Sequence, residues 1–324
     1  MTEQQPVAIV TGITGMDGAI LTGKLLEDGY KVYGLIRRSS RGLDIGNARE
    51  WENHSNLEII EGDLLDSASL NSLCSTAKAD FFWNCAAQSH VNTSFTQPIY
   101  TAQVTGLGVL NCLEAIRQSN YHTRFLNCAT SELFGGVSDK PANEETAFYP
   151  RSPYGVAKLY AYWITKNYRQ SYKMFACSSI CFNHEHYFRG PNFVTKKITK
   201  AVAAIKAGEQ DKLYLGNLAA KRDWGWAPDF VDGFRMMLEK SSMPVDYVLA
   251  TGETHSVREF CELAFSHVGL DYRDYVEVDP RFYRVCEVQV LLGNYSKIKQ
   301  DLGWEPTTKF KELVEKMVDY DLSK

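Results

Sequence analysis

Short apolar segments of strand length alternate with amphipathic segments through the first half of the chain. The segments 7–10, 31–36, 80–86 and 124–129 have the length and apolar character of strands, and 19–28 has the periodicity of a helix. Strands that alternate with helices in this way are typical of βαβ units and a parallel sheet. The pattern therefore predicts an α/β fold built on a doubly wound, Rossmann-type parallel sheet.

The residue pattern of the chain changes after Phe182, where Gly, Pro and Asn interrupt the apolar runs and aromatic residues cluster. We predict a first domain at 1–182 and a smaller α/β lobe mainly at 183–324, with some segments returning to the first domain. Within the lobe, Ser256 followed by Glu259 forms a capping-box pattern at the start of a helix. Thr308 precedes a final amphipathic helix that continues through Tyr320.

Composition and charge favour a small-molecule partner. The 324 residues carry a formal charge of −4 with both signs interspersed, which argues against a protein of nucleic acid or membrane surfaces. No apolar run reaches the roughly 18 to 20 residues that span a bilayer, and the polar start does not resemble a signal peptide. Eight cysteines without a C-x-x-C pair read as reduced thiols, so we expect a cytoplasmic protein.

A glycine-rich loop joins the first predicted strand to the first predicted helix. Gly12, Gly15 and Gly18 form a G-x-x-G-x-x-G pattern in the strand-to-helix context that dinucleotide sites require. Glycines allow a tight turn and a close approach of backbone N–H groups to a diphosphate at the helix N-terminus. Three glycines can also form a plain turn, but this position favours a dinucleotide site.

The end of the second predicted strand bears on the choice of cofactor. An NAD site usually has Asp or Glu there, whereas this chain has Arg37, Arg38, Ser39 and Ser40. Two guanidinium groups and two hydroxyls can hold a 2′-phosphate, which a carboxylate would repel. A solvated basic turn is the alternative, and we predict NADP. The loops after the next strands, 63–64 and 85–89, are predicted to line the same site.

A Tyr-x-x-x-Lys pair, Tyr154 and Lys158, places both side chains on one helix face. The Lys charge is expected to lower the Tyr pKa and so favour a phenolate that accepts a hydroxyl proton. The same spacing recurs three times, and we interpret these copies as ordinary helix surface: Tyr162 and Lys166, Tyr295 and Lys299, Tyr320 and Lys324. Only the first pair begins a helix soon after the fifth predicted strand.

A polar loop, 128–135, ends that fifth strand and contains Thr130 and Glu132. The hydroxyl can hydrogen-bond a reacting sugar hydroxyl, and the carboxylate can reach a neighbouring carbon. A simple helix N-cap is an equally good interpretation of Thr-Ser-Glu by itself. Its place between the strand and the Tyr154 helix favours the catalytic interpretation.

Taken together, these motifs resemble the extended short-chain dehydrogenase/reductase superfamily and, within it, the GDP-mannose 4,6-dehydratases. The resemblance covers nearly the whole chain. It rests on segments 12–18, 37–40, 86–91, 130–135, 149–155, 182–185, 192–195, 215–217, 222–225 and 250–253.

The resemblance implies roles for individual residues. The catalytic set would be Thr130, Glu132, Tyr154 and Lys158. NADP would be held by Gly12, Ile13, Thr14, Gly15, Met16, Asp17, Arg37, Arg38, Ser39, Ser40, Asp63, Leu64, Cys85, Ala86, Ala87, Gln88, Ser89, Tyr100, Lys158, His184 and Arg189. The substrate would contact Ser89, Asn183, Asn192, Phe193, Val194, Lys197, Arg222, Arg284 and Glu287.

The chain departs from the family pattern at a few positions: Met16, His186-Tyr187-Phe188, Trp226 and Val285-Cys286. None of these positions belongs to the catalytic set, but they bear on cofactor fit and on the sugar or base accepted. His184 and His186 alternate around Glu185, yet two such histidines without a third ligand are more often structural, so we expect no metal.

The predicted function is the conversion of GDP-mannose to GDP-4-keto-6-deoxymannose and water, with NADP retained. Another sugar-nucleotide dehydratase, a 4-keto reductase or an epimerase of the superfamily is one alternative. A reductase or epimerase has no use for a carboxylate near C5, so Glu132 favours dehydration. An NADP-binding regulatory protein is the alternative outside enzymes. By analogy with the family we expect a homodimer or homotetramer.

Overall fold

The fold centres on a parallel sheet. The computed structural model describes residues 5–40, 42, 44–136, 140–283 and 286–324. Within these residues, seven parallel strands form one sheet in the order β11-β6-β5-β4-β1-β2-β3. Their bounds are β1 (Val7–Thr11), β2 (Lys31–Ile36), β3 (Leu57–Glu61), β4 (Phe81–Asn84), β5 (Arg124–Thr130), β6 (Ala176–Cys181) and β11 (Tyr247–Leu249). The predicted doubly wound α/β fold is confirmed.

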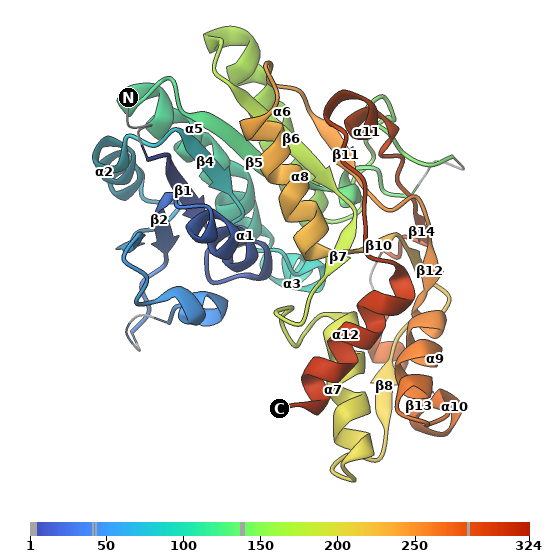
Figure 1. The fold of residues 1–324 in the computed structure, drawn as a ribbon. Coiled ribbons are helices and arrows are strands. Elements are labelled where there is room, and N and C mark those ends of the chain that lie inside the picture. Colours follow the sequence, from blue (N-terminus) through green and yellow to red (C-terminus); the bar gives the residue numbers. More distant parts are fainter. Residues whose placement is uncertain (1–4, 41, 43, 137–139, 284–285) are drawn as a thin grey trace.

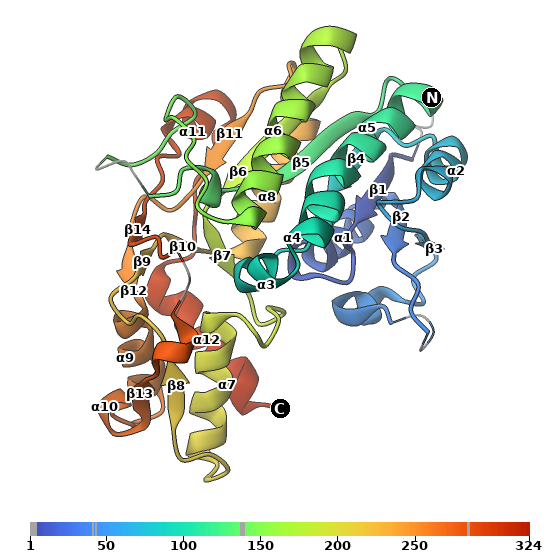
Figure 2. The ribbon, with the colours of Figure 1, turned by 180° about the vertical axis from the view of Figure 1, so that it is seen from behind.

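Helices cover both faces of this sheet (Figures 1 and 2). One face carries α1 (Met16–Glu27) and α8 (Ala227–Glu239), and the other carries α2 (Ser67–Ala77), α5 (Gly108–Ser119) and α6 (Pro153–Tyr172). The remaining segments beside the sheet are η1 (Gly46–Trp51), α3 (Val91–Thr96), α4 (Pro98–Thr101), the π-helical η2 (Ala102–Leu107), η3 (Ser131–Leu133) and α11 (Ser296–Leu302). Each face of the sheet thus has its own apolar core, as a three-layer fold requires.

A second lobe lies beyond the carboxyl ends of the strands (Figure 1). Its helices are α7 (Val194–Lys206), α9 (Val257–His267), α10 (Tyr272–Tyr275), η4 (Pro280–Phe282) and α12 (Phe310–Leu322). Its short strands are β7 (Asn183–Glu185), β8 (Leu213–Leu215), β9 (Lys221–Arg222), β10 (Trp224–Trp226), β12 (His255–Ser256), β13 (Val276–Val278) and β14 (Val290–Leu291). The apolar faces of α7, α9 and α12 pack on one another and enclose a separate core.

The chain passes between the two regions more than once. After β7 enters the lobe, α8 returns to pack on α1, and β11 extends the sheet beside β6, with Tyr247 opposite Ser179. The cleft between the regions is therefore bordered by segments from both halves of the sequence.

Two local predictions in the lobe concern helix starts. The capping box is confirmed, because the Ser256 hydroxyl accepts from the Glu259 backbone while the Glu259 carboxylate accepts from the Ser256 backbone. The last helix begins at Phe310, and the Thr308 N–H donates to the Asp229 carboxylate at 2.9 Å. The loop before α12 is thereby tied to α8. Over the described part of the chain, no helix has both the length and the apolar character needed to cross a membrane.

Buried Asp223 organises the lobe beside the predicted substrate residue Arg222. Its carboxylate accepts hydrogen bonds from the backbone of Thr251, Gly252 and Gly293, at 2.8 to 3.2 Å. Burial raises the pKa of Asp223 to about 6, although these hydrogen bonds lower it. The carboxylate therefore joins three loops in one place and fixes the strand that carries Arg222.

Candidate active site

A cleft with a volume of about 940 Å³ separates the carboxyl ends of the strands from the second lobe. Ligands of open α/β sheets bind at such an edge. The predicted residues that line it are Gly12, Thr14, Gly15, Met16, Asp17, Arg37, Asp63, Leu64, Cys85, Ala86, Ala87, Ser89, Tyr100, Thr130, Glu132, Tyr154, Lys158, Asn183, His184, Arg189, Asn192, Phe193, Val194, Lys197, Arg222 and Glu287. The structure thus brings most of the predicted residues into one space.

The glycine-rich loop has the backbone shape that a dinucleotide needs. Gly12 has a φ of +69°, and a Cβ there would lie 2.7 Å from the Ala86 nitrogen. A Cβ at Gly18 would lie 2.3 Å from the Gly12 carbonyl oxygen. No side chain of the described residues caps the N-terminus of α1, which begins at this loop. The residues present therefore fit a diphosphate bound by backbone N–H groups and the helix dipole.

Buried polar groups connect the glycine-rich loop to the loop that follows β4. The Thr11 hydroxyl donates to the Asn84 side-chain oxygen at 2.7 Å and accepts from the Ala86 N–H at 3.2 Å. Thr11 and Asn84 are register partners on β1 and β4. The two loops that border the diphosphate position are consequently fixed relative to each other.

The basic segment after β2 is divided between two cavities. The Arg37 guanidinium donates to the Tyr100 hydroxyl and lines the main cleft. Arg38, Ser39 and Ser40 line a second cavity of about 600 Å³ together with Glu61, and the Arg38 Nε lies 3.7 Å from the Glu61 carboxylate. Arg37 is therefore placed to contact a ligand in the main cleft, and Arg38 to contact a group that extends beyond it.

Thr130, Glu132 and Tyr154 border the same part of the main cleft. The Thr130 hydroxyl hydrogen-bonds Tyr154 and also accepts from the Glu132 N–H at 3.3 Å. Thr130 thus caps the short η3 turn, which confirms the N-cap interpretation, and its catalytic role stays a prediction. The Glu132 side chain is only 8% exposed, and its charge acts on the Tyr154 phenol. A carboxylate and a phenol therefore face one cleft.

The start of α6 positions the Tyr and Lys. The Ser152 hydroxyl accepts from the Gly155 N–H at 3.0 Å, and Pro153 occupies the first helical turn. Lys158 is buried, which lowers its pKa, and its ammonium donates to the Cys128 carbonyl. Burial raises the pKa of Tyr154, with a smaller lowering by Thr130. The prediction that the Tyr154 pKa is lowered is therefore wrong. Burial removes water from around the phenol, and this effect on the pKa is larger than the opposing ones.

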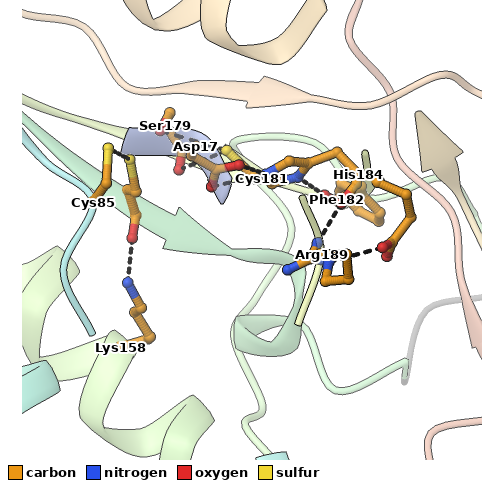
Figure 3. Close-up of polar contacts among 10 residues, drawn as sticks. Asp17, Cys85, Lys158, Ser179, Cys181, Phe182, His184 and Arg189 are labelled. Atoms are coloured by element: carbon orange, nitrogen blue, oxygen red, sulfur yellow. Dashed lines mark hydrogen bonds and ion pairs between the residues drawn. The ribbon is translucent and has the colours of Figure 1, made fainter. Parts of the chain in front are cut away.

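Asp17, His184 and Arg189 form a polar network on the opposite wall (Figure 3). His184 Nε2 lies 3.1 Å from both carboxylate oxygens of Asp17, and Arg189 Nε lies 2.8 Å from the Glu185 carboxylate. Thr195 donates to that same Glu185 carboxylate at 2.8 Å. These partners account for His184 and Glu185 without a metal. The described residues contain no cluster of three potential metal ligands.

The far end of the cleft belongs to the second lobe. Lys197 lies 3.7 Å from the centre of the Phe282 ring and donates to the Tyr214 carbonyl at 2.6 Å. Arg222 lies 3.3 Å from the Glu287 carboxylate. Arg284, predicted to contact the substrate, lies outside the described residues. Phe282 was missed by the sequence analysis, because a single aromatic residue in an irregular segment carries no local signal.

Some predicted residues lie elsewhere. The Ile13 side chain is fully buried in an apolar cluster with Ile36 and Ile45, so only its backbone can face a ligand. The Gln88 amide donates to the Thr101 hydroxyl at 3.0 Å, within its own wall of the cleft. Tyr162, interpreted as helix surface, is 4% exposed and packs on Phe148, so that interpretation is wrong.

The described departures from the family pattern fall in three places. Cys286 accepts from the Arg151 Nε at 3.1 Å, and Val285 lies outside the described residues. Met16 lines the cleft and joins the core beneath the sheet. His186 packs against Tyr187 and Trp226, with ring centroids 3.7 and 4.6 Å apart, and burial lowers its pKa to about 3. Four of the departing residues, His186, Tyr187, Phe188 and Trp226, therefore form one aromatic cluster outside the cleft lining.

Three features lie together at the carboxyl ends of the parallel strands: a dinucleotide-binding loop, a helix with the Tyr/Lys pair, and a buried Thr-Ser-Glu turn. Together they define an extended short-chain dehydrogenase/reductase. A family model described as GDP-mannose 4,6 dehydratase matches residues 9–317. The chain belongs to the GDP-mannose 4,6-dehydratase family.

Named relatives agree with this assignment along their full lengths. The chain is 46% identical to GDP-mannose 4,6 dehydratase 1 of Arabidopsis thaliana, covering 99% of this chain and 91% of that one. It is 44% identical to the Homo sapiens GDP-mannose 4,6 dehydratase, covering 99% and 93%, respectively. It is also 44% identical to the GDP-mannose 4,6-dehydratase of Sinorhizobium fredii, covering 100% and 98%.

Solved structures share the fold at lower identity. A dTDP-glucose 4,6-dehydratase from Streptomyces venezuelae with NAD and TYD bound superimposes with a TM-score of 0.87 at 20% identity, covering 97% of this chain and 96% of that one. The RMD protein from Pseudomonas aeruginosa, complexed with NADPH, gives 0.81 at 22% identity, covering 99% and 100%. At these identities the similarity establishes the fold.

Proposed function

We propose that this chain converts GDP-mannose to GDP-4-keto-6-deoxymannose and water. The observation that carries the proposal is the buried Glu132 carboxylate beside the Tyr154 phenol in the cleft, within a chain of this family. A reductase or epimerase needs the phenol alone, whereas elimination also needs a base for a carbon-bound proton. The bound nicotinamide would accept hydride from the sugar and later return it.

The chain's own groups divide the remaining work. Tyr154 acts as a phenolate after loss of its own proton, a charge that the nearby Lys158 ammonium would favour, and takes the proton of the sugar O4 hydroxyl. Thr130, next to the phenol, aligns that oxygen. The resulting C4 carbonyl acidifies the C5 hydrogen. Glu132 then removes the C5 proton and delivers a proton to the departing C6 hydroxyl, so that water leaves and the carboxylate is restored. When hydride returns to C6, C5 takes up a proton from solvent, and the proton held by Tyr154 is released to solvent. Arg222, Lys197 and Glu287 would hold the nucleotide.

Isotope transfer tests this route. With GDP-mannose deuterated at C4, we expect the product to lose one water and to carry the deuterium at C6, because the hydride never leaves the cleft. Mass spectrometry and NMR of the product would locate the label. Release of deuterium to solvent, or its retention at C4, would contradict the proposal.

We further propose that the cofactor is NADP. Proteins of this fold have been solved with NAD and with NADPH, which supports a nicotinamide dinucleotide and leaves the choice between them to local residues. Arg38 extends from the end of β2 beside Ser39 and Ser40, and its side chain is 81% exposed and reachable by a 2′-phosphate. Charge and hydroxyl donors of this kind favour the phosphorylated ribose.

Arg38→Ala should weaken NADP binding about tenfold and NAD binding less than twofold, because one charge-assisted contact to the 2′-phosphate is lost. Calorimetric titration with each dinucleotide measures both constants. Arg49→Ala is the matched control, since this arginine is also exposed and pairs only weakly with Asp44 at 3.9 Å. Equal losses for both dinucleotides would reject Arg38 as the discriminating residue.

A further inference from the structure

Asp17 places a carboxylate where an anionic ligand must bind. It is the second residue of α1, directly after the glycine-rich loop, and it lines the cleft. A diphosphate at this loop carries negative charge, so an uncompensated carboxylate here would oppose binding. The structure supplies the compensation from a residue 167 positions away in the sequence.

The compensating group is His184, the central residue of β7, which follows β6 and leads into the second lobe. Its Nε2 lies 3.1 Å from each Asp17 carboxylate oxygen, and its Nδ1 lies 2.8 Å from the Phe182 carbonyl oxygen. A carboxylate and a carbonyl can only accept hydrogen bonds. With Asp17 ionised, both ring nitrogens donate, and the His184 ring is then the doubly protonated imidazolium.

Packing holds the ring in this orientation. His184 stacks on Phe230 of α8, with centroids 4.6 Å apart and planes at 18°, and meets the edge of Phe234. Figure 3 shows the His184 ring directed at Asp17, with Arg189 next to it. The pair consequently joins α1, which starts at the cofactor loop, to the strand that leads into the second lobe.

The surrounding charges support an ionised pair. Burial alone would lower the pKa of His184, but the Asp17 charge and hydrogen bond raise it overall. Burial alone would raise the pKa of Asp17, but His184, then Arg189 and Lys158, lower it overall. Further titratable groups that interact with Asp17 are His186 and the Cys85 and Cys181 thiols, and burial keeps the pKa of Cys181 well above its ordinary value.

We propose that the Asp17–His184 ion pair is a positioning device that neutralises the cofactor loop and sets the pH range of cofactor affinity. The inference rests on the proposed function only in requiring that the cleft bind a nicotinamide dinucleotide. Its test measures binding, so a chain that binds the dinucleotide but fails to dehydrate GDP-mannose would leave the inference standing.

The sign of the pH dependence follows from the two shifts. The His184 pKa is raised, so its contribution to stability is full below the ordinary histidine pKa and is lost as pH rises through the folded-state value. The Asp17 pKa is lowered, so its contribution is full above the ordinary aspartate pKa and is lost as pH falls through the folded-state value. At the alkaline limit the proton leaves the pair, and the Asp17 charge then opposes the dinucleotide.

Two variants test the proposed compensation of charge through the NADP dissociation constant, measured by calorimetry. His184→Gln should weaken binding about tenfold, because the Asp17 charge loses its cation. Adding Asp17→Asn should restore binding to within about threefold of the native protein, because the opposing charge is gone. The double variant should also lose the alkaline decline in affinity. A double variant that binds no better than His184→Gln, or keeps that decline, would overturn the proposal.

One measurement avoids variants that fold poorly. Nitrogen NMR of the native protein, labelled at histidine, should show both nitrogens of one buried ring protonated at neutral pH, with the signal assigned to His184 by its absence in His184→Gln. A neutral His184 imidazole under these conditions would also overturn the proposal.

Discussion

Glu132→Gln should reduce turnover of GDP-mannose by about 10²- to 10⁴-fold, the range that a positioned general base contributes. The amide has nearly the shape of the carboxylate, so the η3 turn and its Thr130 cap should remain. In deuterium oxide the native enzyme should place solvent deuterium at C5 of the product, whereas this variant should yield neither product nor C5-labelled substrate. NMR of the sugar ring measures both.

Glu144→Gln is the matched control, because Glu144 is a partly buried glutamate that does not line the cleft. Its carboxylate accepts from the Val248 N–H at 2.8 Å, which a glutamine oxygen can also do. The control should keep near-native turnover. Unchanged turnover in Glu132→Gln would remove Glu132 from its proposed role and with it the argument for dehydration.

Tyr154→Phe should also reduce turnover by about 10²- to 10⁴-fold, but at the earlier step. Without the phenol oxygen, none of the residues that the structure describes is placed to take the O4 proton, so no C4 carbonyl forms. We therefore expect loss of deuterium transfer from C4 together with unchanged NADP affinity, measured by mass spectrometry and calorimetry. Native-like transfer of the label in this variant would exclude Tyr154 as the base.

Tyr162→Phe provides the internal comparison, because Tyr162 and Lys166 repeat the same spacing two turns later on α6. Tyr162 is buried against Phe148, and its hydroxyl faces Asp246. The phenol is therefore part of the core behind the cleft. This variant should lose some stability and keep its catalytic rate, which separates the Tyr-x-x-x-Lys pattern from the position that makes it catalytic.

The periodicity of the chain was sufficient to predict a parallel sheet, four of its strands and the first of its helices. Apolar runs at 7–10, 31–36 and 124–129 lie within β1, β2 and β5, and 19–28 overlaps α1 with a shift at its ends. These elements could be predicted because burial on two faces imposes a local pattern. The glycine-rich loop could also be predicted, because its tight backbone turn requires residues without a side chain.

Other features depended on contacts between distant segments. Tyr154 and Tyr162 have the same local pattern, and only the packed α6 shows that the first borders the cleft and the second the core. The Lys158 charge was expected to govern the Tyr154 pKa, but burial of the phenol, which spacing does not reveal, raises it.

By itself, the sequence determined the α/β class, the dinucleotide loop and the residue types available for chemistry. Only the tertiary structure decided that Asp17 meets His184, that Phe282 lies against Lys197, and that Glu132 and Tyr154 face one cleft. The physical reason is that local patterns record how each segment is buried. Pairing across more than a hundred residues depends instead on how strands and lobes are connected in space.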